Sequence, residues 1–561
     1  MAETSLEAEL WQTAVSLRGT VAPADYKHYV LPLLFIRYLT LRYEQRYHQL
    51  ELFLKDQRSP YFTGDPDIDA ETLSDPVEYQ SYNVFIVPPE ARWSYLRREA
   101  RADDIKLKLD RAMKLLQETH PKLNGLLPPI YANSNLTNEQ VAGLINLFSK
   151  ELFNRGDGSD VLGRAYMYFI SNFASTEGNR GGEFFTPLSI VRLLVEMLEP
   201  GKGKIFDPAC GSCGMFIQSE GFTHNGHGLS FYGQEQIETT LRLGRMNLMM
   251  HGLDGDIRLG NSLLADAHPH LKADIIISNP PFNLKQWRAD KIDPKDPRLN
   301  IGYQRGQVTD GNANYMWMMH YLYHLAADGG TAGYVMANGA MTTNQAQEKE
   351  TRRILIEEGY VDCIVQLPDK LFPNTSIPCC LWFLSKNRSG THGYRARREE
   401  ILFIDARQMG EMLNRRQRQL TEANIKRIAT AYHAYRIPGA TKPDQPGFAK
   451  VAALAEIRQH DYKLTPGIYV GTQADEDDGE PFEEKMPRLI EELRGLFSES
   501  DRLQAEILRD LEGLGETTTD EGMERMGEER LEEKHPLLST IRCCLCLTDQ
   551  AMDRIEINNN G

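Results

Sequence analysis

The chain has 561 residues, of which 41% are hydrophobic and 25% charged, a balance typical of a globular protein rather than a disordered or fibrous one. That length predicts about three domains. No apolar run reaches the roughly 18 residues that a membrane helix needs. The acidic Glu3, Glu7 and Glu9 argue against a signal peptide, so we expect a cytoplasmic protein without a membrane segment. The net charge of −16 excludes a broadly basic surface, although it leaves room for a local basic cleft.

Residues 1–155 are predicted to form an N-terminal helical domain. Apolar residues recur there at helical spacing, at Leu6, Leu10, Ala14 and Leu17. The apolar stretch from Tyr29 to Leu39 continues this pattern. Residues 59–76 are rich in Pro, Asp and Ser, which predicts a loop. We expect further helices from Glu90 to Glu118 and after Asn138.

Residues 156–471 change pattern, because short β-branched segments alternate with helical ones, as in an α/β fold with a largely parallel sheet. The expected strands are Lys204–Phe206, Leu229–Gly233, Asp256–Leu259, Asp274–Ser278, Thr331–Met336 and Val361–Leu367. A later apolar run, Cys379–Leu384, is a candidate hairpin partner for one of them. Helices are expected at Ile237–His251 and Asn314–Ala326. We predict a doubly wound, mostly parallel, Rossmann-like sheet in this domain.

Residues 472–561 are predicted to form a C-terminal helical arm and a tail. An acidic run at 475–478 precedes a heptad-like stretch from Glu484 to Leu514. The apolar stripe of this stretch comprises Leu489, Leu493, Leu496, Leu503, Ile507 and Leu511. The tail beyond residue 515 follows no recognisable pattern.

A glycine-rich segment follows the first expected strand. It runs from Asp207 to Gly214 as Asp-Pro-Ala-Cys-Gly-Ser-Cys-Gly, and a helix is expected from Met215. Glycines let the backbone approach a ligand at the carboxyl edge of the sheet, where α/β folds bind cofactors. The G-x-G-x-x-G spacing of dinucleotide sites is absent. Asp207 instead suits a ligand with positive charge, such as a sulfonium and an amino group, and an ordinary tight turn is the alternative interpretation.

Two polar residues end the next two expected strands. Glu235 follows Gly211 by 24 residues, a position that suits two ribose hydroxyls. Asn261 follows the third strand, where a polar side chain can meet the adenine amine of a cofactor. Each match by itself also fits an ordinary turn. The three features together occur in the order expected of a nucleotide-like cofactor site.

The eight cysteines include adjacent pairs and do not resemble a disulfide framework, so we expect reduced thiols. Cys210 and Cys213 form a C-x-x-C pair at a helix start, which is also typical of a redox dithiol. We disfavour that function, because the pair lies in a glycine-rich turn of a much larger domain. The tail cluster of Cys543, Cys544 and Cys546 lacks a second ligand pair, so no metal is expected.

The fourth expected strand ends in Asn279-Pro280-Pro281-Phe282. The amine of adenine is a poor nucleophile, because its lone pair is delocalised into the ring. The side-chain oxygen of Asn279 and the carbonyl of Pro280 would favour a pyramidal nitrogen, and consecutive prolines would hold these acceptors in place. Phe282 offers an aromatic face for an extruded base. A simple strand-ending turn is the alternative.

With these motifs the chain resembles the amino-methyltransferases of DNA, specifically the modification subunit of type I restriction-modification systems. The run 182–187, the helical opening from Leu10 to Tyr38 and the segment Gly479–Met486 carry this resemblance. It implies S-adenosylmethionine as cofactor and Asn279, Pro280, Pro281 and Phe282 as the catalytic motif. The implied cofactor site comprises Glu183, Phe184, Phe185, Thr186, Pro187, Leu188, Asp207, Ala209, Gly211, Ser212, Gly214, Glu235 and Asn261.

Thr186 and Pro187 are also predicted as the N-cap and first residue of a helix from Leu188 to Leu198. The resemblance further implies adenine-N6 methylation of double-stranded DNA with a flipped target base. A separate specificity subunit would choose the sequence, and a restriction subunit would translocate and cleave. It also implies two modification subunits per specificity subunit. Such partners account for the acidic net charge, and the chain lacks a Walker motif.

Other functions stay open on the sequence alone. The first is a methyltransferase acting on a protein glutamine or an RNA base, since a planar amide suits the same Asn-Pro-Pro geometry. Transfer to cytosine N4 is a nearer variant, although Ser more often leads the motif there. The second is a non-catalytic assembly subunit, and the third is the dithiol oxidoreductase.

Overall fold

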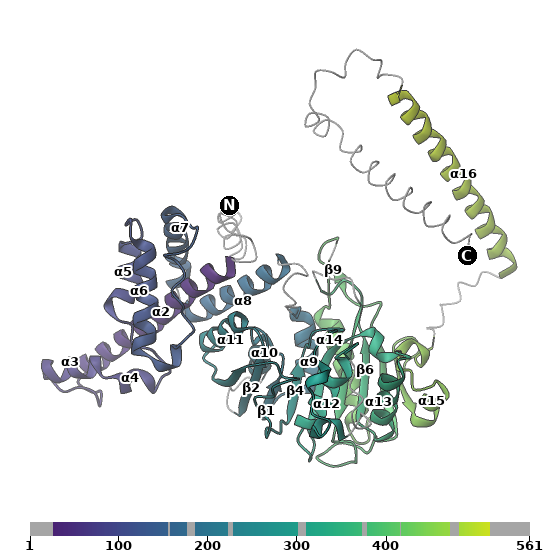
Figure 1. The fold of residues 1–561 in the computed structure, drawn as a ribbon, viewed down its shortest axis with the longest axis horizontal. Helices are drawn as coiled ribbons and strands as arrows, with labels where there is room; N and C mark the ends of the chain where they lie inside the picture. The colour runs from purple at the N-terminus through teal and green to yellow at the C-terminus, as the bar shows by residue number, and fades with distance from the viewer. Residues whose placement is uncertain are drawn as a thin grey trace. The chain divides into compact units, whose positions relative to one another are not determined.

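The computed structural model describes residues 26–154, 158–176, 186–222, 228–300, 310–372, 378–415, 417–471 and 482–515. The chain divides into two compact units, residues 1–473 and 474–561. Figure 1 follows their elements in chain order. None of the helices in the described ranges combines the length and apolar character needed to cross a membrane.

The first described part is helical. Its elements are α2 (Tyr26–Lys55), α3 (Pro66–Ser74), α4 (Pro76–Gln80), α5 (Trp93–Arg98), α6 (Ile105–Thr119), α7 (Asn138–Phe148) and α8 (Gly158–Thr176), with short 3-10 turns η2 (Pro89–Ala91), η3 (Pro121–Leu123) and η4 (Glu151–Asn154). One hydrophobic core joins these helices and includes Leu243, Met246 and Met250 from α11 (Glu238–Met250). Tyr38 Oη donates to the Met249 carbonyl at 3.0 Å, so the helical part is packed directly on α11.

Two expectations for this region are wrong. The segment 59–76 contains α3, because the Asp65 side chain caps the first turn and Pro66 occupies its first position. The helix expected from Glu90 to Glu118 is broken into η2, α5 and α6. A turn in which Ala102 N donates to Glu99 O interrupts it before α6 begins. The helix expected after Asn138 is confirmed as α7, with a capping box at its start.

The second part of the first unit contains a nine-stranded sheet. Its strands are β1 (Gly203–Asp207), β2 (Leu229–Glu235), β3 (Gly255–Leu259), β4 (Ile275–Ser278), β5 (Thr331–Ala337), β6 (Val361–Gln366), β7 (Cys379–Ser385), β8 (Glu400–Asp405) and β11 (Ala449–Ala453). The order is β11-β8-β6-β7-β5-β4-β1-β2-β3. Only β7 and β11 run antiparallel to their neighbours in this sheet. The expected hairpin partner, β7, lies between β5 and β6.

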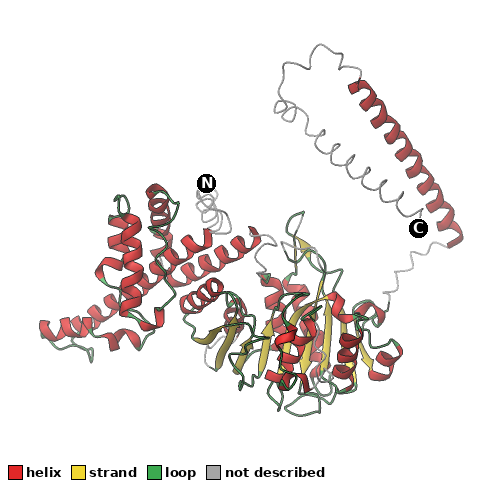
Figure 2. Ribbon diagram, viewed as in Figure 1, coloured by secondary structure: helices red, strands yellow, loops and turns green. Residues whose placement is uncertain are grey.

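Helices cover both faces of this sheet (Figure 2). They are α9 (Leu188–Leu198), α10 (Gly214–Phe222), α11, α12 (Asn314–His324), α13 (Ala346–Glu357), α14 (Glu422–Arg436) and α15 (Leu454–Gln459), with 3-10 turns η6 (Ala289–Lys291), η7 (Pro297–Asn300), η8 (Asn338–Met341) and η9 (Pro466–Ile468). Side chains of α9, α10 and α14 share one core, and those of α12 and α13 share the other. The doubly wound, mostly parallel α/β fold is therefore confirmed.

The edge strand β11, its neighbour β8 and the small β9 (Glu411–Met412)–β10 (Arg418–Gln419) hairpin were not expected. β11 reads Ala-Lys-Val-Ala-Ala and carries little β-branched signal, so it becomes a strand through pairing with β8. In the second unit, α16 (Phe482–Gly515) confirms the expected long helix. Of its predicted stripe, the described side chains of Leu493, Leu496, Leu503 and Ile507 are exposed.

One buried carboxylate ties the β6 side of the sheet to its neighbours. Asp362 is fully buried and accepts from Arg397 Nε at 2.8 Å and Tyr432 Oη at 2.9 Å, while Arg388 Nε lies 3.1 Å away. Burial by itself would raise the pKa of Asp362. The charges of Arg397 and Arg388 outweigh burial and lower this pKa to about 2.

We expect Asp362→Asn to lower the free energy of unfolding by about 3–5 kcal/mol at neutral pH, since it leaves buried guanidinium groups without their counter-charge. The lowered pKa means that this stabilisation is complete above about pH 4 and is lost as the pH falls toward the pKa in the folded state. Denaturant titrations from neutral to acid pH measure both effects. The exposed Asp328→Asn is the control, with an expected change within about 0.5 kcal/mol. Equal stability of the two variants would contradict the assignment.

Candidate active site

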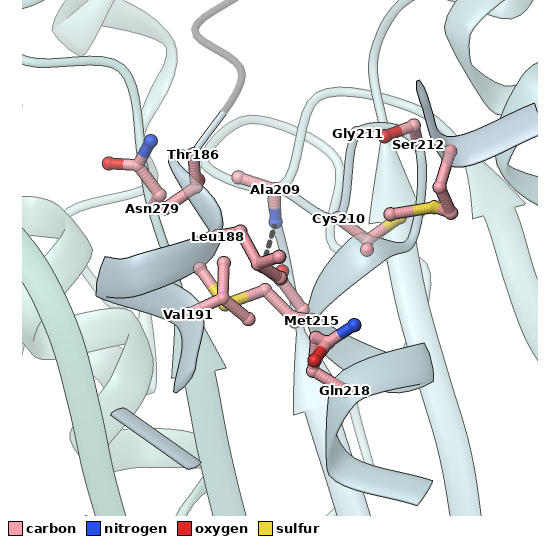
Figure 3. A pocket seen from close by; sticks show the side chains of 13 residues that line it. Thr186, Leu188, Val191, Ala209, Cys210, Gly211, Ser212, Met215, Gln218 and Asn279 are labelled. Carbon is pink, nitrogen blue, oxygen red and sulfur yellow. Dashed lines mark hydrogen bonds between the residues drawn. The ribbon is translucent and has the colours of Figure 1, made fainter. Parts of the chain in front are cut away.

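The carboxyl ends of β1 and β4, which are neighbouring parallel strands, open onto a pocket. Its lining comprises Met167, Thr186, Leu188, Val191, Asp207, Ala209, Cys210, Gly211, Ser212, Gly214, Met215, Gln218 and Asn279. Figure 3 shows Asn279 and Thr186 on one side and the turn with Gly211 and Ser212 on the other. Eight of the residues expected from the sequence therefore border one cavity: Thr186, Leu188, Asp207, Ala209, Gly211, Ser212, Gly214 and Asn279.

Asp207 joins the two strands at the floor of the pocket. Its Oδ1 accepts from Ser278 Oγ at 2.7 Å and from Ala209 N at 3.0 Å, and the residue is 2% exposed. Burial raises the pKa of Asp207 to about 7, although these two hydrogen bonds favour the ionised form. A positively charged ligand beside such a carboxyl group would stabilise its ionised form and lower this pKa.

The turn between β1 and α10 is held by two side chains behind it. Glu235, at the end of β2, accepts from Gly211 N at 3.0 Å and from Ile237 N at 2.8 Å. Asn247 of α11 donates its side-chain N–H to Ser212 O at 2.8 Å. The backbone of the turn is thus fixed in place by β2 and α11. Asn247 was not singled out from the sequence, where it is one polar residue within an amphipathic helix.

Asn261 also acts on backbone groups. Its Oδ1 accepts from Leu263 N at 3.0 Å and Leu264 N at 3.1 Å, and its Nδ2 donates to Gln236 Oε1 at 3.1 Å. Neither Asn261 nor Glu235 belongs to the lining of the pocket. The structure places both at the ends of β3 and β2, beside the turn rather than in the cavity wall.

The Asn-Pro-Pro-Phe tetrapeptide begins directly after β4. The Asn279 Oδ1 and Nδ2 atoms are both buried and have no hydrogen-bond partner among the described residues. Pro280 is buried, and Pro281 and Phe282 are half-buried. The Phe282 ring meets Phe372 edge to face, with centroids 5.8 Å apart. Phe372 lies in the segment after β6 and was not expected from the sequence.

The segment before α9 is only partly described. Glu183, Phe184 and Phe185 lie outside the described residues, whereas Thr186 and Leu188 line the pocket. Helix α9 has the expected bounds, but the predicted cap is wrong. Pro187 is the N-cap residue, with extended φ and ψ of −55° and 137°, and no side chain caps the helix.

Other lining residues were missed, although helical spacing points to two of them. Val191 follows Leu188 by three positions on α9, and Gln218 follows Gly214 by four on α10, so each shares a helix face with a predicted residue. Met167, from α8, carries no such signal.

The C-x-x-C pair lies in the same turn. Cys210 and Cys213 are both buried, and Cys213 N donates to Cys210 O at 2.8 Å. A hydrogen bond with Cys213 and burial raise the pKa of the Cys210 thiol well above its usual value. A redox dithiol needs an accessible thiolate, so these two residues serve the packing of the turn.

Among the described residues, Asp266, His320 and His324 bring metal-ligating atoms together on the opposite side of β1. His324 Nδ1 faces the Leu271 carbonyl and Nε2 faces Asp266 Oδ2, each at 3.0 Å, so both ring nitrogens serve hydrogen bonds. Arg298 donates to His320 Nδ1 at 3.1 Å, and its positive charge opposes a cation there. The group is best explained as a buried hydrogen-bond network.

Two family models match the chain. The model described as N-6 DNA Methylase matches residues 157–478, which is more than half of the chain. The model described as HsdM N-terminal domain matches residues 6–150.

Curated relatives and solved structures agree with these models. The type I restriction enzyme MjaIX methylase subunit of Methanocaldococcus jannaschii is 40% identical over 519 residues, covering 91% of each chain. The HindI methylase subunit of Haemophilus influenzae is 40% identical over 456 residues, covering 76% of this chain and all of the relative. A type I methyltransferase subunit from Streptococcus thermophilus superposes with a TM-score of 0.70 at 25% identity, covering 83% of this chain and 99% of that one. The chain therefore belongs to the N-6 DNA methylase family, among the methylase subunits of type I restriction enzymes.

Proposed function

We propose that Asn279, Pro280, Pro281 and Phe282 carry out the methyl transfer to adenine N6. Family membership makes the chain an S-adenosylmethionine-dependent adenine-N6 DNA methyltransferase, and the proposal concerns which residues do the chemistry. Asn279 Oδ1 and the Pro280 carbonyl accept hydrogen bonds from the two N–H groups of the target amine. This directs the nitrogen lone pair toward the methyl donor, and Phe282 stacks on the extruded base.

The unpartnered amide of Asn279 is the observation that supports this proposal most strongly. A buried polar group without a hydrogen bond costs about 1–3 kcal/mol. The amide of Asn279 lies at the pocket wall with neither polar atom satisfied by a described residue. Such a side chain is explained by a ligand that supplies both a donor and an acceptor, as an adenine edge does.

We propose that the cofactor binds in the pocket between α9 and the turn after β1. Asp207, Ala209, Gly211, Ser212 and Gly214 hold it there, together with residues 183–188, of which Thr186 and Leu188 line the pocket. When bound, S-adenosylmethionine supplies an electrophilic methyl group on a sulfonium. The Asp207 carboxyl fits this cation, because its partners among the described residues include no positive side chain. Glu235 and Asn261 complete the proposed set of cofactor-site residues. Each accepts hydrogen bonds from backbone N–H groups and so fixes the turn beside it.

We propose a three-part organisation: an N-terminal helical domain (1–155), a methyltransferase domain (156–471) and a C-terminal arm and tail (472–561). The arm docks on a specificity subunit through its exposed apolar stripe. That subunit selects the DNA sequence for two chains of this type, and a restriction subunit joins the complex. Because the substrate is genomic DNA, we place the complex in the cytoplasm.

Co-expression with the neighbouring specificity subunit tests the catalytic assignment. Asn279→Ala is expected to lower the rate of N6-methyladenine formation by about 10²–10³-fold, because it removes a preorganised acceptor for the amine. Transfer of labelled methyl groups to DNA, followed by digestion to nucleosides, measures this. The exposed Asn133→Ala is the matched control and is expected to keep full activity. Label in protein or RNA with wild-type protein, or unchanged transfer in Asn279→Ala, would contradict the proposal.

The raised pKa of Asp207 predicts pH-dependent cofactor binding. A cationic ligand favours the ionised carboxylate, so affinity is expected to rise about tenfold between about pH 6 and pH 8. The stability of the ligand-free protein changes in the opposite direction. Because the folded protein binds a proton at Asp207 more tightly than the unfolded chain does, the contribution of Asp207 to the free energy of unfolding falls as pH rises from about 4 to 7.

Calorimetry with S-adenosylmethionine measures this effect. Asp207→Asn keeps an oxygen acceptor for Ser278 and Ala209 but cannot ionise, so its pH profile reports the titration of every other group. The expected result is a steeper rise in the wild-type protein than in Asp207→Asn. Identical profiles would refute a titrating Asp207 at the cofactor site.

A further inference from the structure

The loop after the tetrapeptide, residues 283–300, has an unusual backbone. Asn283, Gln286 and Arg288 adopt left-handed conformations, with φ of 51°, 52° and 68°. Residues other than glycine seldom adopt a left-handed backbone conformation. Those that do cluster at functional sites, where surrounding contacts hold them in place. Three left-handed residues lie within six positions, starting one position after Phe282. We infer that contacts with other parts of the protein hold the loop in this shape.

Two residues on the far side of the loop impose that shape. Asp310 accepts from Gln286 N through its backbone oxygen at 2.9 Å and from Ala289 N through Oδ1 at 2.6 Å. Asn314, at the start of α12, accepts from Asn283 N at 3.0 Å and donates to Asn283 Oδ1 at 2.9 Å. The buried Trp287 anchors the loop in the core of the α12 face.

Charges are divided unevenly within this loop. Two of its three acidic residues are paired within the loop, Asp290 with Arg288 at 3.0 Å and Asp296 with the buried Arg298 at 2.6 Å. The third, Asp293, accepts a backbone hydrogen bond from Lys295 N at 2.8 Å.

Three exposed lysines remain, at positions 285, 291 and 295. None of them forms an ion pair within the described part of the chain. The loop therefore presents ammonium groups to solvent on a fixed backbone, in a chain of net charge −16.

We propose that Lys285, Lys291 and Lys295 form a phosphate clamp that holds the DNA strand carrying the target adenine. This deepens the proposed function and rests on it. Lys285 follows Phe282 by three residues, so their Cα atoms are at most about 11 Å apart. One strand of DNA carries a phosphate about every 3.4 Å along the helix axis. The phosphates that flank a base stacked on Phe282 thus lie within reach of Lys285, and Lys291 and Lys295 follow it in the same loop.

The lysines are tested together as Lys285→Ala/Lys291→Ala/Lys295→Ala, in the complex with the specificity subunit. Removing one phosphate-binding lysine lowers the slope of log affinity against log salt by about 0.9, so a fall of about 2–3 is expected for the triple variant. Fluorescence titration of a random-sequence duplex between about 50 and 200 mM salt measures the slope. The control replaces three exposed lysines elsewhere, Lys55, Lys202 and Lys426, and is expected to keep the wild-type slope.

Substitutions of Asp310 distinguish the effect of loop geometry on DNA binding from the effect of charge. Asp310→Ala and Asp310→Asn both remove one negative charge, which by itself strengthens DNA binding, but only Asn keeps an oxygen for Ala289 N. We expect Asp310→Ala to weaken DNA binding several-fold and Asp310→Asn to leave it equal or tighter. Equal behaviour of the two variants would overturn the role of the fixed loop.

The outcomes distinguish this inference from the proposed function. A wild-type complex that methylates DNA, with the triple-lysine variant keeping the wild-type salt slope, overturns the clamp and leaves the catalytic assignment intact. Loss of assembly with the specificity subunit in that variant also overturns it, because the lysines would then bind an acidic protein surface. Failure of the catalytic assignment shows instead as unchanged methylation by Asn279→Ala.

Discussion

The hydrogen bond from Ser278 Oγ to Asp207 Oδ1 joins the carboxyl ends of β1 and β4, and both halves of the proposed active site depend on it. Asp207 opens the glycine-rich turn, and Ser278 immediately precedes Asn279. The bond is buried at 2.7 Å between neighbouring parallel strands. The distance between the glycine-rich turn and the tetrapeptide is thus set by the sheet rather than by a loop, and sites built on strands hold their geometry more precisely.

Two buried carboxylates of the same sheet differ in how the protein compensates them. Asp362 is surrounded by arginines that lower its pKa to about 2. Within the described residues Asp207 accepts from a hydroxyl and an amide, and burial raises its pKa to about 7. The first is fully compensated within the protein. Among the described residues, Asp207 has no cation as a hydrogen-bond partner and the Asn279 amide has no partner at all. Uncompensated polar groups in a stable fold are expected where a ligand completes them.

The core strands could be predicted because β-branched runs between glycine-rich turns carry a strong local signal, and Asp207, Gly211 and Asn279 are placed by the strands before them. Edge strands such as β11 have no such signal, since their pairing decides them. The fixing of Glu235 and Asn261 by backbone N–H groups could not be predicted either, because residue type and position do not specify partners. Phe372 meets Phe282 through a distant segment, and single-sequence patterns contain no information on such long-range packing.

The net charge supports the proposal that this chain works with a partner subunit. Binding to phosphates supplies most of the affinity of DNA-binding proteins, and strong binders neutralise about 6–10 of them. A clamp of three lysines positions one nucleotide over Asn279 but neutralises too few phosphates to hold a duplex against a net charge of −16. Positioning and overall grip are therefore separable tasks. A chain with this charge suits the first task, and we assign the second to the proposed specificity subunit.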